Sequence, residues 1–148
     1  MNAVNFFSKE EKELIKSAVK EAELNTSGEI RVHLDNHCKE EVMDRAAWWF
    51  GKLEMHLTER RNGVLFYLAV KDHKFAILGD AGINAVTPDD FWDSIKEKMV
   101  KHFSEGDFSS GLKEGILMAG VALKDHFPYE DGDVNELSDE ISFGGKQE

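Results

Sequence analysis

Residues 63–79 read GVLFYLAVKDHKFAILG, and this stretch decides the fold. Its first part, residues 64–70, is an unbroken apolar run of strand length, which is typical of a central strand covered on both faces. The polar residues 71–74 predict a hairpin turn, and the apolar residues 75–78 predict a strand that returns antiparallel to the first. The rest of the chain therefore has to cover both faces of the first strand.

The sequence before this hairpin predicts two helices and a strand. Ser8 and Glu11 have the spacing of a capping box, and apolar residues then recur at helical spacing, so residues 8–24 are expected to form an amphipathic helix. Residues 29–34 alternate between polar and apolar, which is the period of a strand with one buried face. An apolar stripe at helical spacing within residues 40–59 predicts the second helix.

The sequence after the hairpin predicts two more helices. Thr87 precedes a proline and an acidic turn, so it is expected to cap a helix that runs to about Phe103. Either Asp107 or Ser109 is expected to cap a last helix that continues through Phe127. Helices on both sides of the hairpin are thus available to cover the sheet.

These elements predict one α/β domain, a three-layer α/β/α sandwich with a Rossmann-like mixed sheet. Strands 29–34 and 64–70 are expected to be parallel, because the helix between them makes a right-handed crossover. The domain is expected to span residues 1–127, followed by an acidic and partly mobile tail, residues 128–148. This tail holds seven acids against one lysine. Its apolar residues are expected to dock on the domain or on a partner: Val134, Leu137, Ile141 and Phe143.

Composition limits the class of protein. The chain has 148 residues, 41% of them hydrophobic, which suits a single core. Eighteen basic residues against 29 acidic ones give a net charge of −11, which repels nucleic acids and anionic membranes. Residues 1–7 do not resemble a signal peptide, and the longest apolar run is far too short to span a membrane. We therefore expect a cytoplasmic protein, more often a monomer than an oligomer, with neither a nucleic acid nor a membrane as partner.

The predicted topology gathers acidic residues at two ends of the sheet. Carboxylates at the first end can supply hard oxygen ligands to Ca²⁺ or Mg²⁺: Glu29, Asp80, Asp89 and Asp90. The second end collects Asp35, Asp72 and Asp107. The first end is the stronger candidate for a metal site. The alternative is that all these acids only cap turns and helix N-termini.

Further residues at the first end can support a turn or a phosphate: Glu59, Arg60, Arg61, Asn62, Gly79 and Gly82. The two glycines let the backbone bend and offer its carbonyl groups. The two arginines can hold a phosphate beside a bound cation, or they can pair with Glu29 and Glu59. The sequence leaves both possibilities open.

Other kinds of site have little support. The six histidines lack the spacing of a zinc site. Cys38 is the only cysteine, which fits a reducing compartment, and nothing near it in sequence marks a base that would make it a nucleophile. Glycine-rich nucleotide-binding motifs and the hydrolase nucleophile elbow are absent from the sequence.

Several short motifs in a fixed order resemble the TPM domain family. They are Ser27–Val32, Asn62–Leu65, Ile77–Ile83, Phe103–Phe108 and the pair Gly111-Leu112. Two further segments, Thr58–Gly63 and Asp139–Phe143, together with Asp133–Leu137, resemble a short soluble bacterial branch of the family. The resemblance covers about residues 8–127.

The resemblance implies an α/β/α sandwich and several activities. Members of the family are described as acid phosphatases, as binders of divalent cations, notably Ca²⁺, and as modules in photosystem repair or at membrane receptors. This chain differs from the membrane-attached members, and its Asp80 stands where many members have an aromatic residue. The acidic position that follows the third strand in the family matches Asp89 or Asp90 here.

Three functions are therefore expected, in order of preference. The first is a non-enzymatic domain that binds a divalent cation, Ca²⁺ before Mg²⁺, through Glu29, Asp80, Asp89 and backbone carbonyls. The second is a metal-assisted acid phosphatase in which Arg60 or Arg61 steadies the phosphoryl charge. The third is an interaction module that uses the apolar residues of the tail. We favour the first because acids cluster, whereas the sequence names no nucleophile and base.

Overall fold

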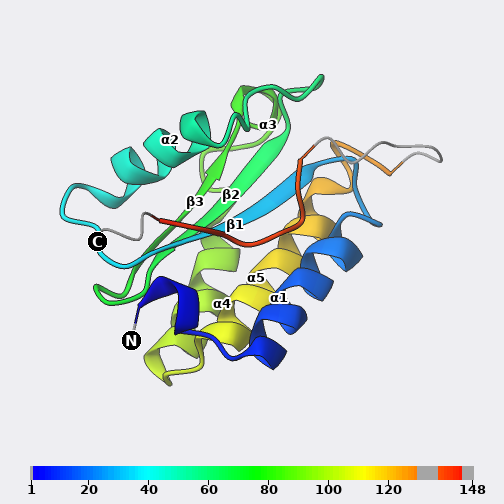
Figure 1. Cartoon of the computed structure of the whole chain (residues 1–148). Helices are drawn as coiled ribbons and strands as arrows, with labels where there is room; N and C mark the ends of the chain where they lie inside the picture. The colour runs from blue at the N-terminus through cyan, green and yellow to red at the C-terminus, as the bar shows by residue number, and fades with distance from the viewer. Residues whose placement is uncertain (1, 130–136, 145–148) are drawn as a thin grey trace.

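A mixed four-stranded sheet lies at the centre of the protein (Figure 1). This computed structural model describes residues 2–129 and 137–144. The strands are β1 (Glu29–Asp35), β2 (Gly63–Ala69), β3 (Lys74–Gly79) and β4 (Ser142–Phe143), in the spatial order β3-β2-β1-β4. As predicted, β1 and β2 are parallel and β3 returns antiparallel to β2.

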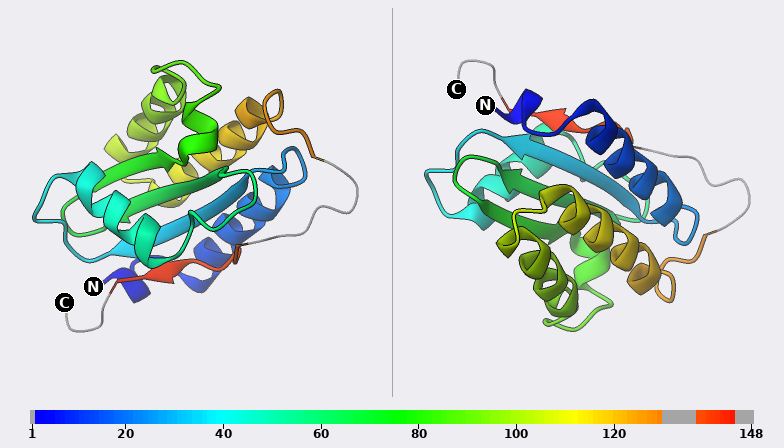
Figure 2. Two further views of the ribbon diagram at one scale, coloured as in Figure 1. Left: turned by 90° about the horizontal axis from the view of Figure 1, so that it is seen from above. Right: turned by 90° about the horizontal axis from the view of Figure 1, so that it is seen from below.

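Helices cover both faces of this sheet (Figure 2). One face carries α1 (Lys9–Ala22), α4 (Asp93–Ser104) and α5 (Phe108–Leu123), and the opposite face carries α2 (Val42–Lys52). A short helix, α3 (Ala81–Asn84), follows β3, and a 3₁₀ turn, η1 (Ala3–Asn5), precedes α1. The predicted α/β/α sandwich is therefore confirmed.

The apolar run in β2 is the centre of two cores. Val64, Phe66 and Leu68 face the three-helix side and belong to the larger cluster. Leu65 and Tyr67 face α2 and belong to the smaller one. Every residue of β2 is buried, which is why its sequence shows no alternation.

Local signals fix the ends of α1 and α5. Ser8 and Glu11 form the predicted capping box of α1. Asp107 caps α5 by accepting a hydrogen bond from the amide of Ser110. Gly106 takes a left-handed φ of 80° after α4, which ends that helix and turns the chain into α5. These termini agree with the sequence.

The second helix is shorter than its apolar stripe suggests. α2 ends at Lys52, whereas the stripe extends within residues 40–59. Glu54 adopts a left-handed φ of 58°, which no helix can continue, and Leu57 is 62% exposed. The last apolar positions of the stripe therefore lie in turns rather than on the buried face of a helix.

The helix after the hairpin also differs from its prediction. Thr87 does not cap it; its hydroxyl donates to the carbonyl of Ile83 at 2.9 Å instead. Asp80 caps the unpredicted α3, and α4 begins only at Asp93. The first residues of the predicted helix form turns instead, in which the amide of Phe91 donates to the carbonyl of Pro88 at 3.1 Å and the amide of Asp93 to that of Asp90 at 3.0 Å.

The alternation in β1 predicts one buried face, and this is wrong. Polar residues of the second face are buried as well: Glu29, His33 and Asp35. β1 is an inner strand, flanked by β2 and β4, and α2 covers its polar face near the carboxyl end. A polar residue on such a face must find partners inside the protein.

The end of the tail is docked on the domain. We call residues 137–144 the C-terminal strap. Its Ser142 and Phe143 form β4, which pairs in parallel with His33 and Leu34 of β1. Leu137, Ile141 and Phe143 pack against the two cores, whereas Val134 lies outside the described residues. Within the described part of the chain, none of the helices is both long and apolar enough to cross a membrane.

Candidate functional site

The first end of the sheet brings Glu29, Asn62 and Asp80 to one edge, as the topology predicted. Glu29 pairs with Gly63 in the parallel ladder, and the amide of Asp80 donates to the carbonyl of Gly63 at 3.0 Å. Both acids therefore flank Gly63 on the same face, about 10 Å apart at two strand spacings. We call this end of the sheet the first edge. It comprises Glu29, Asn62 and Asp80, together with Glu23 and the strap residues Leu137 and Asp139 beside them.

Asp80 is engaged by an arginine. Arg61 binds both carboxylate oxygens through Nε at 2.8 Å and Nη2 at 2.9 Å, and the amide of Ala81 donates to Oδ1 at 2.7 Å. Arg61 holds a left-handed φ of 51°, and a Cβ on Gly82 would lie 2.2 Å from the carbonyl oxygen of Arg60. The turn that carries Arg60 and Arg61, which we call the arginine turn, thus lies directly against α3. Arg61 pairs with Asp80 rather than with Glu29 or Glu59.

Glu29 is a buried carboxylate, 5% exposed, at the start of β1. Its Oε1 accepts a hydrogen bond from the amide of Leu137 in the strap at 3.0 Å. Asn62 lies beside it: the carbonyl of Asn62 accepts from the amide of Glu29 at 3.2 Å. The side-chain Nδ2 of Asn62 donates to the carbonyl of Ser27, but its buried Oδ1 has no hydrogen-bond partner among the described residues. Such an orphaned oxygen is unusual in a folded protein.

Two further acids meet at the first edge. Glu23, just past α1, accepts a hydrogen bond from the amide of Ile30 at 2.9 Å, and its side chain is hydrogen-bonded to that of Asp139 in the strap. Burial raises the pKa of Glu23, and Asp139 and the nearby charge of Glu29 raise it further, to about 9. At neutral pH, Glu23 is therefore protonated and hydrogen-bonded to Asp139.

Sequence patterns did not indicate this acid pair. Glu23 reads as one more polar residue at a helix end, and Asp139 as part of an acidic tail. The approach of the strap to α1 joins residues more than a hundred positions apart, and no local pattern encodes it.

The other residues predicted at this end are more exposed. Asp89 and Asp90 lie in the exposed turn before α4, and Glu59 is exposed in the arginine turn. Arg60 donates to the hydroxyl of Ser27 at 3.3 Å. Gly79 approaches Trp92 and Ile83 of the larger core rather than a ligand. Within the described ranges, no three His, Cys, Asp or Glu side chains are arranged as a ready-made metal site.

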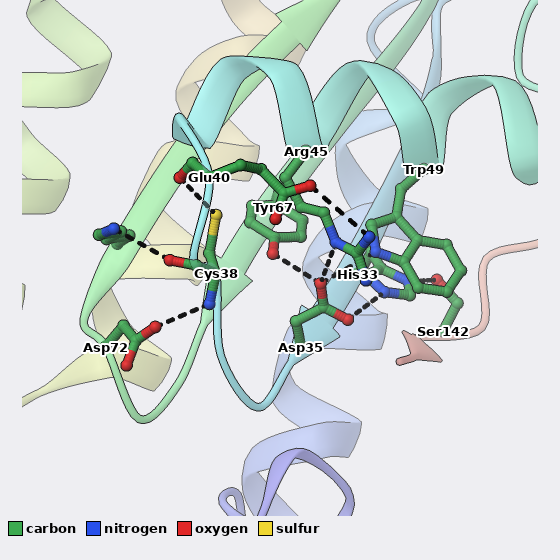
Figure 3. Close-up of polar contacts among 10 residues, drawn as sticks. His33, Asp35, Cys38, Glu40, Arg45, Trp49, Tyr67, Asp72 and Ser142 are labelled. Carbon is green, nitrogen blue, oxygen red and sulfur yellow. Dashed lines mark hydrogen bonds and ion pairs between the residues drawn. The ribbon is translucent and has the colours of Figure 1, made fainter. Parts of the chain in front are cut away.

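The second end of the sheet has the opposite character (Figure 3). Asp35 is fully buried and accepts four hydrogen bonds from side chains. The donors are Tyr67 Oη at 2.6 Å, Trp49 Nε1 at 2.9 Å, Arg45 Nε at 3.2 Å and His33 Nε2 at 3.2 Å. Three of these bonds reach Oδ2 and one reaches Oδ1, so the protein itself supplies the donors that compensate the charge of this carboxylate.

The electrostatics of this network keep Asp35 ionised and His33 neutral. Burial would raise the pKa of Asp35, but the hydrogen bonds from His33 and Tyr67 outweigh it, so the pKa lies below its usual value. Burial lowers the pKa of His33, and Asp35 offsets this only in part. Burial and the bond to Asp35 raise the pKa of Tyr67, so it stays a donor.

Ser142, His33 and Asp35 form a hydrogen-bonded row that resembles a catalytic triad in composition. Ser142 Oγ lies 2.7 Å from His33 Nδ1. The imidazole is nevertheless fully buried, and its ring centre lies 3.8 Å from that of Trp49. A substrate cannot reach this base, so the row joins the strap to β1 and α2 rather than activating a nucleophile.

The two other acids predicted at the second end cap turns. Asp72 accepts from the amide of Cys38 at 2.7 Å and lies 3.0 Å from His37 Nδ1. Asp107 caps α5. Cys38 is a buried free thiol whose pKa is raised by burial. The alternation in β1 marks the strand face that carries this network, but the pattern predicted that face to be exposed, so the sequence did not indicate a buried network.

Comparison with known proteins identifies the family. The model of the TPM domain matches residues 1–122. The chain belongs to the TPM domain family. The solved structure of the BA42 protein from the psychrophilic bacterium Bizionia argentinensis is 46% identical, with a TM-score of 0.90 over 95% of this chain and 97% of that one. None of the curated proteins matches this TPM domain.

Two more distant structures share the fold of this TPM domain. The N-terminal domain of a P. gingivalis protein is 19% identical, with a TM-score of 0.69 over 85% of this chain and 83% of that one. The N-terminal domain of the cg2496 protein from Corynebacterium glutamicum is 11% identical, with a TM-score of 0.62 over 92% and 80% of the two chains.

Proposed function

We propose that this TPM domain is a non-enzymatic binder of a divalent cation and that the cation binds at the first edge. The observation that carries the proposal is the hydrogen bond between the carboxyl groups of Glu23 and Asp139, close enough to Glu29 for its charge to raise the pKa of Glu23. Within the described residues these three acids do not yet form the arrangement of a metal site, so the cation has to draw them together. The buried Oδ1 of Asn62, which has no donor within the described residues, adds a neutral oxygen beside Glu29.

The physical reason is the cost of gathering buried negative charge. Carboxylates that approach one another in a poorly solvated place must gain a compensating positive charge or take up a proton. Here a proton does this, because the pKa of Glu23 is raised to about 9. A divalent cation compensates more charge than one proton, so it can displace that proton and draw the carboxylates together.

Carboxylate and amide oxygens in an irregular arrangement favour Ca²⁺ over Mg²⁺. Ca²⁺ accepts six to eight oxygen ligands in flexible geometry, whereas Mg²⁺ demands a near-ideal octahedron. Asp80, Asp89 and Asp90 remain proposed as additional ligands. Asp80 has to release Arg61 first, and Asp89 and Asp90 have to approach from an exposed turn. We therefore place Glu29 at the centre of the site.

Catalysis lacks comparable support. A metal-assisted phosphatase needs a cation for the phosphoryl oxygen and a basic group for its charge. Arg61 is bound through two nitrogens to Asp80. His33, which lies 2.7 Å from the hydroxyl of Ser142, is fully buried. The cytoplasmic location and the monomeric state stay predictions from the sequence.

A calcium titration followed by amide NMR tests the proposal. We expect Ca²⁺ to shift the amides of residues 23–31, 62–64 and 137–140, and to leave those of residues 35–38 and 70–73 in place. Glu29→Gln keeps the shape and hydrogen-bond acceptor of the side chain while it removes the charge, so it is expected to weaken binding at least tenfold. Asp72→Asn is the matched control at the opposite end and is expected to bind Ca²⁺ as the parent does. Shifts confined to the second end, or an unchanged affinity in Glu29→Gln, would contradict the proposal.

A further inference from the structure

The C-terminal strap contacts the domain in the manner of a bound peptide. Its backbone extends the sheet: Ser142 and Phe143 pair with His33 and Leu34, and the amide of Gly144 donates to the carbonyl of Leu34 at 2.8 Å. In Figure 1 the strap (red) passes beside β1, and it bends at residues 137 and 140 before the short strand β4. This is the geometry by which an extended peptide adds a strand to an open sheet edge.

The side chains of the strap are bound at successive positions. Leu137 packs with the smaller core, near the place where Gly63 has no side chain. Ile141 and Phe143 pack against the larger core. Between these two, Ser142 turns to the opposite face and meets His33 at 2.7 Å. The alternation along the strap thus fits two pockets on one face of the sheet and a polar partner on the other.

Charge adds a second element of recognition. A groove of about 200 Å³ lies between α1 and the strap. On the α1 side it is lined by three lysines, Lys9, Lys12 and Lys16, and one acid, Glu13. Lys16 is paired with Glu140, and the ammonium group of Lys12 lies 5.4 Å from the centre of the Phe143 ring. A lysine-lined groove on a protein of net charge −11 favours an acidic ligand.

The strap lies outside the residues that the family model matches. The TPM domain match ends at residue 122, whereas the strap begins at residue 137. Among the described strands, β4 is the only neighbour of β1 on its outer side. Without the strap, β1 would present the unpaired backbone groups of an edge strand.

We propose that the edge of β1 and the lysine groove of α1 form a docking site for an extended acidic segment of a partner protein, and that the strap occupies this site in cis. The partner segment runs parallel to β1 and carries acidic residues followed by an apolar residue, a hydroxyl and an aromatic ring, as the strap does at 139–143. The recognition depends on the strand edge, the lysines and His33, and it does not require a bound cation.

Occupancy in cis makes the strap a competitor of the partner. A segment tethered by a short linker has an effective concentration on the order of 1 mM. If the free segment binds with a Kd of about 100 µM, the strap is docked about 90% of the time and weakens the apparent affinity of a partner roughly elevenfold. A partner segment therefore has to bind the edge of β1 more tightly than the strap does, or bind when the strap is released.

A cleavable form of the full chain tests this inference. A protease site is introduced within residues 130–136, and a labelled synthetic peptide with the sequence of residues 137–144 serves as the probe. We expect the intact protein to bind the probe weakly. After cleavage and removal of the strap, we expect the domain to keep its fold and bind the probe about tenfold more tightly.

Two variants identify the surface that binds the probe. Lys16→Glu is expected to abolish most of the binding, and a probe with lysine in place of Glu140 is expected to restore it. Lys20→Glu, on the same helix but outside the groove, is the matched control and is expected to bind as the parent does. Loss of the fold on cleavage, or a cleaved domain that does not bind the probe, would show that the strap is an integral strand and would overturn the proposal.

Discussion

The two ends of the sheet bury carboxylates in opposite ways. At the second end, Asp35 is surrounded by donors from three elements and stays ionised. At the first edge, Glu23 and Asp139 approach each other and Glu29, and a proton replaces the missing positive charge. Burial of an acid is therefore not by itself a sign of a ligand site. The informative quantity is the number of hydrogen-bond donors that the protein supplies to the buried carboxylate.

This difference assigns the two ends different tasks. A carboxylate that receives its hydrogen bonds from several elements joins those elements, and removing it leaves buried donors without a partner. Carboxylates with too few donors lower the stability of the fold, and a bound cation raises it again. We expect the second end to respond strongly to mutation and the first edge to respond to pH and to metal ions.

The largest effect is expected at the second end. Asp35→Ala removes the acceptor of Tyr67, Trp49 and Arg45 in one step, so it is expected to lower the free energy of unfolding by about 3–5 kcal/mol. Urea unfolding measures the change. Asp72→Ala, which removes an acceptor at the rim of the same end, is the control and is expected to lower the free energy of unfolding much less. Similar losses in the two variants would remove the distinction between a saturated buried acid and a turn cap.

The next largest effect is a loss of stability as the pH rises from 4.5 to about 9. The pKa of Glu23 is about 9 in the folded protein and 4.5 as the reference value for an unfolded chain. Between these values the folded state binds the extra proton, so its contribution is full below pH 4.5 and is lost as the pH rises towards 9. Glu23→Gln, which resembles the protonated acid, is expected to flatten this slope in unfolding curves measured from pH 5 to 9. If the slope of stability against pH is unchanged in the variant, the loss with rising pH comes from other groups.

The second end is expected to lose stability at acidic pH. The pKa of His33 lies below its usual 6.5 in the folded protein because burial disfavours the imidazolium ion. Below pH 6.5 the unfolded state therefore binds more protons, and stability falls as the pH falls. Asp35, whose pKa is also lowered, adds a further loss below about pH 3.8. His33→Asn is expected to reduce the loss between pH 6.5 and 5, whereas His126→Asn, at an exposed position, is expected to retain it.

The smallest effect is expected where the strap meets the second end. Ser142→Ala removes one partly buried hydrogen bond to His33, so it is expected to cost about 1 kcal/mol. The loss is expected to appear first as faster exchange of the Gly144 amide, which belongs to the same strand pairing. Equal protection of this amide in the parent and the variant would show that the serine does not hold the strap.

Much of the fold could be predicted because local patterns agree with it. The apolar run of β2, the capping box of α1 and the cap at Asp107 each specify their element without distant help. The start of α4 could not be predicted, because the hydroxyl of Thr87 bonds back to the carbonyl of Ile83 rather than capping the helix that follows. The end of α2 could not be predicted either, because its apolar stripe continues past Lys52, where the helix stops.

The candidate site could be predicted only at the level of topology. Strand order placed Glu29 and Asp80 at one edge, and the structure agrees. Side-chain pairing decides the rest: Asp80 is bound by Arg61, and Glu23 meets Asp139 of the strap. Such pairings join residues from distant segments, and one sequence contains no pattern that specifies them.

A structure determined with Ca²⁺ bound tests the central claim most directly. We expect the ion at the first edge, with oxygens of Glu29, Glu23 and Asp139 among its ligands, and the four hydrogen bonds of Asp35 unchanged. An ion at the second end, or full exposure to Ca²⁺ with the Glu23–Asp139 pair still intact and the first edge empty, would contradict the account.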